Sequence, residues 1–129
     1  YEKTFFSLVS ESQVVEDTLF LSEKIWKAIA NRHPFVLVGS YKTLDYLHKE
    51  GFKTFDGWID ESYDKEKHPY KRISKIIREV KRLCSMSQSE MNKFLSEVDD
   101  IIEYNYDKLI NDHYNIDRTF EELEAITNV

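Results

Sequence analysis

The feature that most constrains the fold is a pair of short apolar segments, residues 4–9 and 35–38, separated by a helical pattern. The first, TFFSLV, is β-branched, aromatic and apolar enough for a strand that is buried on both faces, and the second, FVLV, is a continuous apolar run rather than an alternating one. Such runs are typical of strands in a parallel sheet that is covered by helices. Between them, apolar residues from Ile25 to Ile29 recur at the spacing of one helix face. The sequence therefore predicts a β-α-β unit with its helix at about residues 23–32.

The pattern continues beyond the second strand. Leu44 and Leu47 predict a short amphipathic helix, which Gly51 can end in the left-handed conformation. FKTF at 52–55 then predicts a third strand. We therefore expect an α/β fold with a small, Rossmann-like parallel sheet of three or more strands, whose crossovers are right-handed.

The rest of the chain predicts helices. Pro69 at a first helical position opens a helix that ends near Cys84. Ser87 and Glu90 form a capping box that starts a long helix ending at about residue 111. A short last helix is expected at 119–126. The inward apolar positions of the first of these helices are predicted to be Ile73, Ile76, Ile77, Val80 and Leu83.

Length and composition favour one domain over residues 1–129, with an α/β core at 4–84 and a helical brace at 87–129. The single cysteine, Cys84, cannot form an intramolecular disulfide, and we expect a packed thiol in a reducing, cytoplasmic compartment. No apolar run approaches the roughly 20 residues needed to span a bilayer. Because the chain begins with Tyr1 rather than Met, we expect it to be a piece of a longer chain.

The net charge of −6 is unevenly distributed, at about +3 over residues 58–86 and about −8 over 87–129. The strongly acidic last third argues against a nucleic-acid partner. Within the basic part, Lys71, Lys75, Arg78 and Arg82 recur along one helix face. They could contact phosphates, or they could pair with carboxylates of the acidic last third.

Polar residues follow the first two predicted strands, where ligands bind in an open parallel sheet. Glu11 lies just after the first strand, and Gly39-Ser40 forms the turn after the second. Ser22, Glu23 and Lys24 begin the intervening helix. Ser22 and Glu23 are ordinary capping residues, but a cation such as Lys24 in the first turn opposes the helix dipole. A phosphate bound at that helix end would remove the conflict.

A third polar segment follows the predicted third strand. It carries four carboxylates, Asp56, Asp60, Glu61 and Asp64. They could hold a hard cation or contact sugar hydroxyls. The pattern is not that of an EF-hand, and we assign no metal. The alternative is a solvated loop pinned by Trp58 and Tyr63. His48, on the preceding helix, is expected on the helix flank rather than as a catalytic base.

Two of these stretches resemble known glycosyltransferases. FFSLVSES…FLSEKIWKAIANRHPFVLVG resembles the donor-binding motif of the α1,3-fucosyltransferases, roughly F-x-L-x-F-E-N-S, then Y-x-T-E-K-L-W/F-x-A-L, then P-V-V-x-G. YLHKEGFKTF…WIDESYD is similar to phage and marine bacterial proteins that are described as glycosyltransferases. The resemblance covers about residues 5–84.

The resemblance implies the C-terminal, donor-binding domain of a two-domain glycosyltransferase. Glu23 and Lys24 would contact ribose and phosphate of a nucleotide-sugar, with a GDP-sugar expected as donor, and Glu11 matches the Glu of F-E-N-S. Ser22 and the Gly39-Ser40 turn complete the expected binding residues. A glycan or other acceptor, and the general base, would belong to the other domain. The alternative is a non-catalytic α/β interaction module of a phage or bacterial protein, in which the acidic helices dock a partner.

Overall fold

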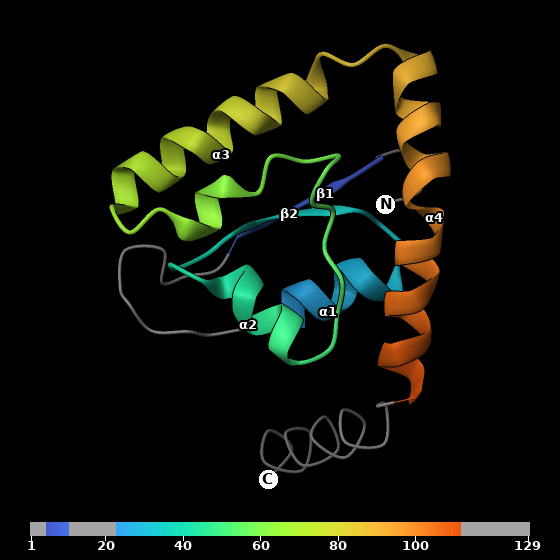
Figure 1. The fold of residues 1–129 in the computed structure, drawn as a ribbon. Coiled ribbons are helices and arrows are strands. Elements are labelled where there is room, and N and C mark those ends of the chain that lie inside the picture. Colours follow the sequence, from blue (N-terminus) through green and yellow to red (C-terminus); the bar gives the residue numbers. More distant parts are fainter. Residues whose placement is uncertain (1–4, 11–22, 112–129) are drawn as a thin grey trace, which may run out of the picture.

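The computed structural model describes residues 5–10 and 23–111 (Figure 1). Strand β1 (Ser7–Ser10) is followed by helix α1 (Glu23–Ala30) and strand β2 (Phe35–Val38). The remaining elements are α2 (Thr43–Lys49), the 3-10 helix η1 (Ser62–Lys65), α3 (Pro69–Cys84) and α4 (Gln88–Asn111). The described elements thus confirm a mixed α/β fold.

The two strands pair in parallel, with Ser7 opposite Phe35 and Ser10 opposite Val38. This β1-α1-β2 arrangement is the unit that the two apolar runs predict. Phe35, Val36 and Leu37 are at most 1% exposed, as expected for a strand that is covered on both faces. Figure 1 shows α3 on one side of the strands, and α1 and α2 on the other.

The predicted third strand does not form: residues 52–55 are described, and they lie outside the sheet. Several of their backbone groups bond to side chains instead. The Lys53 N–H donates to Oδ1 of Asn105 (2.9 Å), and the Phe55 N–H donates to Glu61 (3.1 Å). On β2, the Leu37 N–H donates to the Tyr63 hydroxyl (3.3 Å). With these groups satisfied, the segment packs on β2 through its side chains, and the rings of Phe35 and Phe55 meet edge to face at 5.1 Å.

Helix α3 begins at Pro69 and ends at Cys84 as predicted, but its inward face is rotated from the expected one. Arg72, Ile76, Glu79 and Leu83 are buried, whereas Ile77 is 49% exposed. Cys84, expected as a packed thiol, is also exposed. The predicted row of inward isoleucines was therefore wrong at Ile77, because two charged residues occupy the inward face.

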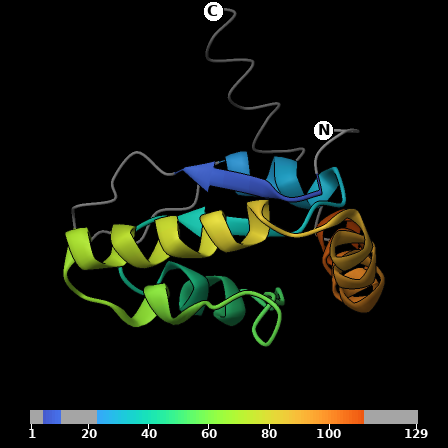
Figure 2. The same cartoon turned by 90° about the horizontal axis from the view of Figure 1, so that it is seen from above.

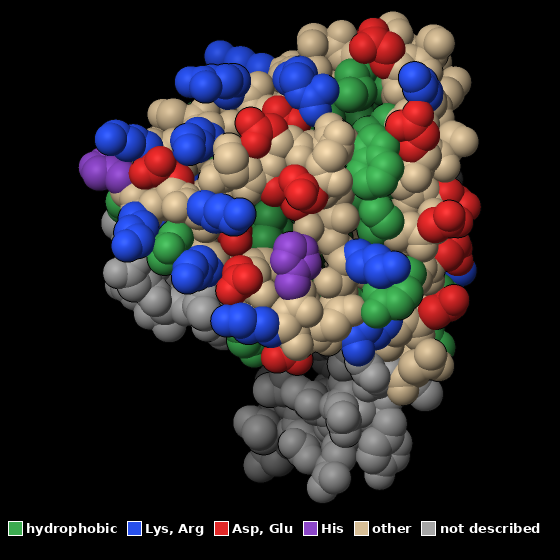
Figure 3. All heavy atoms as spheres, viewed as in Figure 1, with side chains coloured by type: hydrophobic (Ala, Val, Ile, Leu, Met, Phe, Trp, Pro, Cys, Tyr) green, Lys and Arg blue, Asp and Glu red, His purple; other side chains and the backbone are tan. Residues whose placement is uncertain are grey.

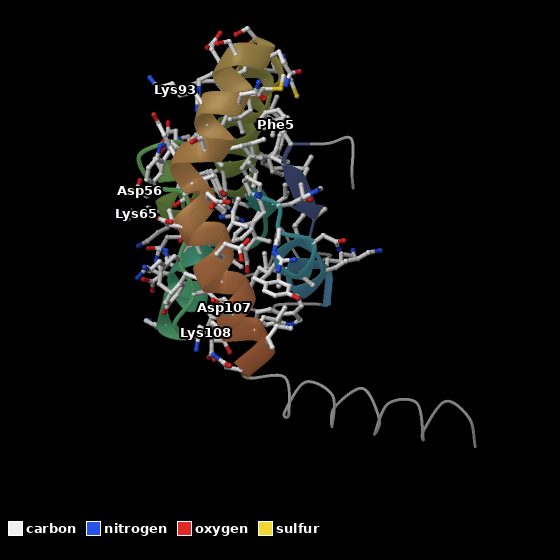
Figure 4. The ribbon with its side chains drawn as sticks, turned by 90° about the vertical axis from the view of Figure 1, so that its right-hand side faces the viewer. Phe5, Asp56, Lys65, Lys93, Asp107 and Lys108 are labelled. Carbon is white, nitrogen blue, oxygen red and sulfur yellow. The ribbon has the colours of Figure 1, made fainter. Side chains whose placement is uncertain are left out.

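Helix α4 crosses the ends of the other elements (Figures 2 and 4). The capping box is confirmed, since the Glu90 N–H donates to the Ser87 hydroxyl and the Ser87 N–H to the Glu90 carboxylate. Arg32, just after α1, donates to Glu103 at 3.0 Å and so ties α1 to α4. At the other end, the Phe5 and Phe94 rings lie 6.0 Å apart. The helix expected at 119–126 lies outside the described residues.

Candidate functional site

The site predicted from the sequence lies where β1 and β2 end and α1 begins (Figure 1). Because Ser10 pairs with Val38, the two strands end side by side. Lys24 is in the first turn of α1, and its Nζ donates to the Ser10 carbonyl at 3.1 Å. The cation therefore lies at the carboxyl edge of the sheet, next to the amino end of the α1 dipole.

The structure describes only some of the other residues that the sequence predicted for this site. Glu11 and Ser22 lie outside the described residues. Glu23 begins α1, but its side chain is not described. Of the six residues predicted to bind the nucleotide-sugar, the structure thus places Lys24, Gly39 and Ser40 together at one edge.

The Gly39-Ser40 turn has a structural role at this edge. A Cβ at Gly39 would lie 2.9 Å from Oγ1 of Thr43, so the turn needs glycine for close packing. The Thr43 hydroxyl donates to the Ser40 carbonyl at 2.6 Å. Ser40 itself is 4% exposed. These two residues therefore shape the edge and leave little of the Ser40 hydroxyl open to solvent.

Arg72 is a residue that the sequence analysis missed. It is 2% exposed, and its Nε donates to the Gly39 carbonyl at 3.1 Å. Its Nη1 donates to the carbonyl of Glu66 at 2.8 Å. The guanidinium thus joins α3 to the turn after β2 and places a buried positive charge there. Its spacing in the sequence could have indicated its burial, because Arg72 lies four residues before the buried Ile76 and so on the same face of the helix.

Two further cations lie around an aromatic ring after the same turn. The Nζ atoms of Lys42 and Lys67 lie 5.3 Å and 5.9 Å from the centre of the Tyr41 ring, within the range of cation–π attraction. Lys42 has a φ of 64°, a left-handed conformation that a non-glycine residue adopts at some cost. The carboxyl edge is consequently rich in positive charge. The sequence analysis did not predict that Tyr41, Lys42 and Lys67 lie together.

Asp64 caps helix α2. Its two carboxylate oxygens accept hydrogen bonds from the backbone N–H groups of Leu44 (2.7 Å) and Asp45 (3.1 Å). The Lys42 N–H donates to the Asp64 carbonyl (2.9 Å). Burial raises the pKa of Asp64, while these backbone hydrogen bonds act in the opposite direction. A carboxylate therefore occupies the amino end of α2 where an anion would otherwise bind.

Glu61 is buried and forms part of a hydrogen-bonded chain. Its carboxylate accepts from the Thr54 hydroxyl at 2.6 Å, and Nε2 of His48 lies 2.7 Å from the same hydroxyl. Burial raises the pKa of Glu61 to about 7, and nearby Asp56 and Asp64 add to the rise. His48 is on the exposed flank of α2, as expected, and is linked through Thr54 to an acid that titrates near neutral pH.

Asp60, another of the predicted carboxylates, is exposed. It accepts from the Ser62 N–H at 3.1 Å, and this hydrogen bond lowers its pKa. All four predicted carboxylates line one cavity of about 370 Å³, which Leu44, Asp45, His48, Ser62 and Lys65 also line. Within the described residues, no group of three or more His, Cys, Asp or Glu side chains is arranged to hold a metal ion. Two of the four carboxylates, Glu61 and Asp64, accept hydrogen bonds from the backbone N–H groups of Phe55 and Leu44.

The loop that carries these carboxylates is pinned by Trp58 and Tyr63, as the alternative interpretation predicted, but Glu61 and Asp64 are buried rather than solvated. The hydroxyl of Tyr63 bonds to β2, and the Trp58 indole donates to Glu97 of α4 at 2.9 Å. Glu79 of α3 accepts from the Asp60 N–H at 3.0 Å. The loop is thus held by α3, α4 and the sheet.

Fold and site together define an α/β protein built on a β-α-β unit, with a cationic carboxyl edge. None of the described helices is both long and apolar enough to cross a membrane. Comparison of the chain with protein-family models, with curated proteins and with solved structures finds no match.

Proposed function

We propose that the chain is the donor-binding half of a nucleotide-sugar glycosyltransferase, similar to the fucosyltransferases. The observation that carries the proposal is the position of Lys24. It is a cation in the first turn of α1, beside the carboxyl end of β1, and its Nζ lies 3.1 Å from the Ser10 carbonyl. A diphosphate at that helix end would accept from backbone N–H groups and from Lys24.

The surrounding charge supports the same ligand class. Arg72 is buried against the turn after β2, and Lys42 and Lys67 lie around Tyr41. A diphosphate brings two negative charges to this edge, so these cations would favour its binding at longer range. Because Asp64 occupies the amino end of α2, the phosphates would bind at α1 rather than α2.

In this function the chain contributes to transfer through electrostatics. As the bond between sugar and diphosphate breaks, negative charge develops on the departing nucleoside diphosphate, and Lys24 would stabilise it. Such preorganised stabilisation is worth several kcal/mol in a closed, dry site. An acceptor-binding domain would supply the acceptor hydroxyl and the base that removes its proton.

The test is calorimetric titration of the protein with GDP, UDP and ADP. We expect binding of at least one of them, with GDP the tightest if the resemblance extends to the base. Absence of binding by all three at millimolar concentration would count decisively against a donor site.

The interaction module is the second candidate, and one observation favours it. Helix α4 exposes Asp99, Asp100 and Asp107 along its length, which would suit a basic partner. Under this function nucleotides do not bind, and reversing these charges removes the partner from a pull-down without changing the fold.

A further inference from the structure

The outer face of α3 combines exposed apolar side chains with a row of cations. Tyr70 is 72% exposed and Ile77 is 49% exposed, two helical turns apart and hence on one face. Ile73 and Val80 are half-buried beside them.

The cations lie next to this apolar row. Lys71, Lys75 and Arg78 line a shallow hollow of about 290 Å³ together with Tyr70, Ser74 and Glu66. Glu66 is the one carboxylate of the hollow, and it pairs with Lys75 at 3.4 Å. Figure 3 shows Lys and Arg side chains gathered along α3. Three cations against one carboxylate, with two hydroxyls, suit a phosphate group.

Neighbouring charges leave the face positive. Lys81 is also exposed, whereas Glu79, the one acid within α3, is buried and paired with Arg82. The exposed acids of α4, such as Asp99 and Asp100, belong to a different helix that crosses the end of the molecule (Figure 4). This separation of charge would orient α3 toward an extended anionic surface.

We propose that the outer face of α3 binds an anionic lipid surface, with a lipid phosphate in the hollow between Lys71, Lys75 and Arg78. A flat bilayer surface can engage the outward cations of α3, Lys71, Lys75 and Arg78, at the same time. Its interfacial region also accepts Tyr70 and Ile77, whose apolar atoms a nucleic-acid backbone would leave in water. Added salt weakens the attraction to anionic lipid, because dissolved ions shorten the Debye length over which the charges interact.

The proposal is tested by flotation of the protein with vesicles of phosphatidylcholine alone and of phosphatidylcholine mixed with phosphatidylglycerol. We expect binding to the mixed vesicles only. The double variant Lys71→Gln, Arg78→Gln should bind about 25-fold more weakly, at about fivefold for each cation removed. The matched control is Lys49→Gln, Lys93→Gln, which removes two exposed cations elsewhere and should bind like the unaltered protein.

A second variant separates the apolar contribution from the charge. The double variant Tyr70→Ser, Ile77→Ser should weaken binding to the mixed vesicles and leave the salt dependence of binding unchanged. Circular dichroism of each variant tests whether it is folded. Equal binding by the Lys71, Arg78 variant and its control would overturn the proposal. So would binding of inorganic phosphate, single-stranded RNA or an acidic peptide with no binding to the mixed vesicles.

Discussion

The side-chain amide of Asn105 pairs with both backbone groups of Lys53, which is 52 residues away in the sequence. Oδ1 of Asn105 accepts from the Lys53 N–H at 2.9 Å, and Nδ2 donates to the Lys53 carbonyl at 2.9 Å. Asn105 is 2% exposed. One side chain of α4 thus supplies to residue 53 the two hydrogen bonds that a neighbouring strand would give.

Replacing this residue should destabilise the protein. Asn105→Ala leaves a part-buried N–H and carbonyl without their partner, and we expect the free energy of unfolding to fall by about 2 kcal/mol. Asn92→Ala, at an exposed position of the same helix, should change it by less than about 0.5 kcal/mol. Urea denaturation measures both variants, and equal stabilities would contradict the role assigned to Asn105.

This pair also shows where sequence reasoning fails. Residues 52–55 have the composition of a strand, but the N–H groups of Lys53 and Phe55 donate to side chains, those of Asn105 in α4 and of Glu61. No local sequence pattern predicts a hydrogen-bond partner that is so distant in the chain. By contrast, β2, the start of α3 at Pro69 and the Ser87 cap of α4 depend on neighbouring residues, and the sequence predicted them correctly.

The candidate site divides in the same way. Helical spacing placed Lys24 at the first turn of α1 from local sequence alone. Arg72 was missed because a buried guanidinium whose acceptors are backbone carbonyls, such as that of Gly39, has no sequence motif. Asp64 was predicted as a sugar or cation contact, and its position as the cap of α2 depends on a contact across about twenty residues.

The cap that Asp64 provides can be tested by substitution. Asp64→Ala removes the acceptor of two backbone N–H groups at the start of α2, and we expect a loss of about 1 to 2 kcal/mol in the free energy of unfolding. The exposed neighbour Asp60 is the control, since Asp60→Ala removes one solvent-exposed hydrogen bond and should cost less than about 0.5 kcal/mol. A ligand-dependent effect at Asp64 with no change in stability would contradict the capping role.

Stability should fall as the pH rises because of Glu61. In the folded protein its pKa is about 7, against an ordinary value of 4.5, so the folded state holds a proton that the unfolded chain has already released. The stabilising contribution is therefore complete below about pH 4.5 and is lost as the pH rises to about 7, by at most about 3 kcal/mol. Burial of Asp64 raises its pKa and acts in the same direction.

The variant Glu61→Gln isolates this contribution. A glutamine resembles the protonated acid, since its amide can donate to Thr54 while its oxygen accepts from the Phe55 N–H. We expect the free energy of unfolding of the variant to depend less on pH between about pH 4.5 and about pH 7, so that it gains on the unaltered protein as the pH rises. Parallel curves for the two proteins would show that Glu61 does not titrate in this window.

The donor-site proposal is tested most directly by the affinity of a nucleoside diphosphate for two lysine variants of α1. Lys24→Ala removes a charge-assisted contact, and we expect calorimetry to show binding weakened by about 1.5 to 3 kcal/mol, with little loss of stability. Lys27→Ala removes the same charge from an exposed position in the last turn of the helix and should leave affinity unchanged. Unchanged affinity in Lys24→Ala, or an equal loss in both variants, would contradict a diphosphate site at the amino end of α1.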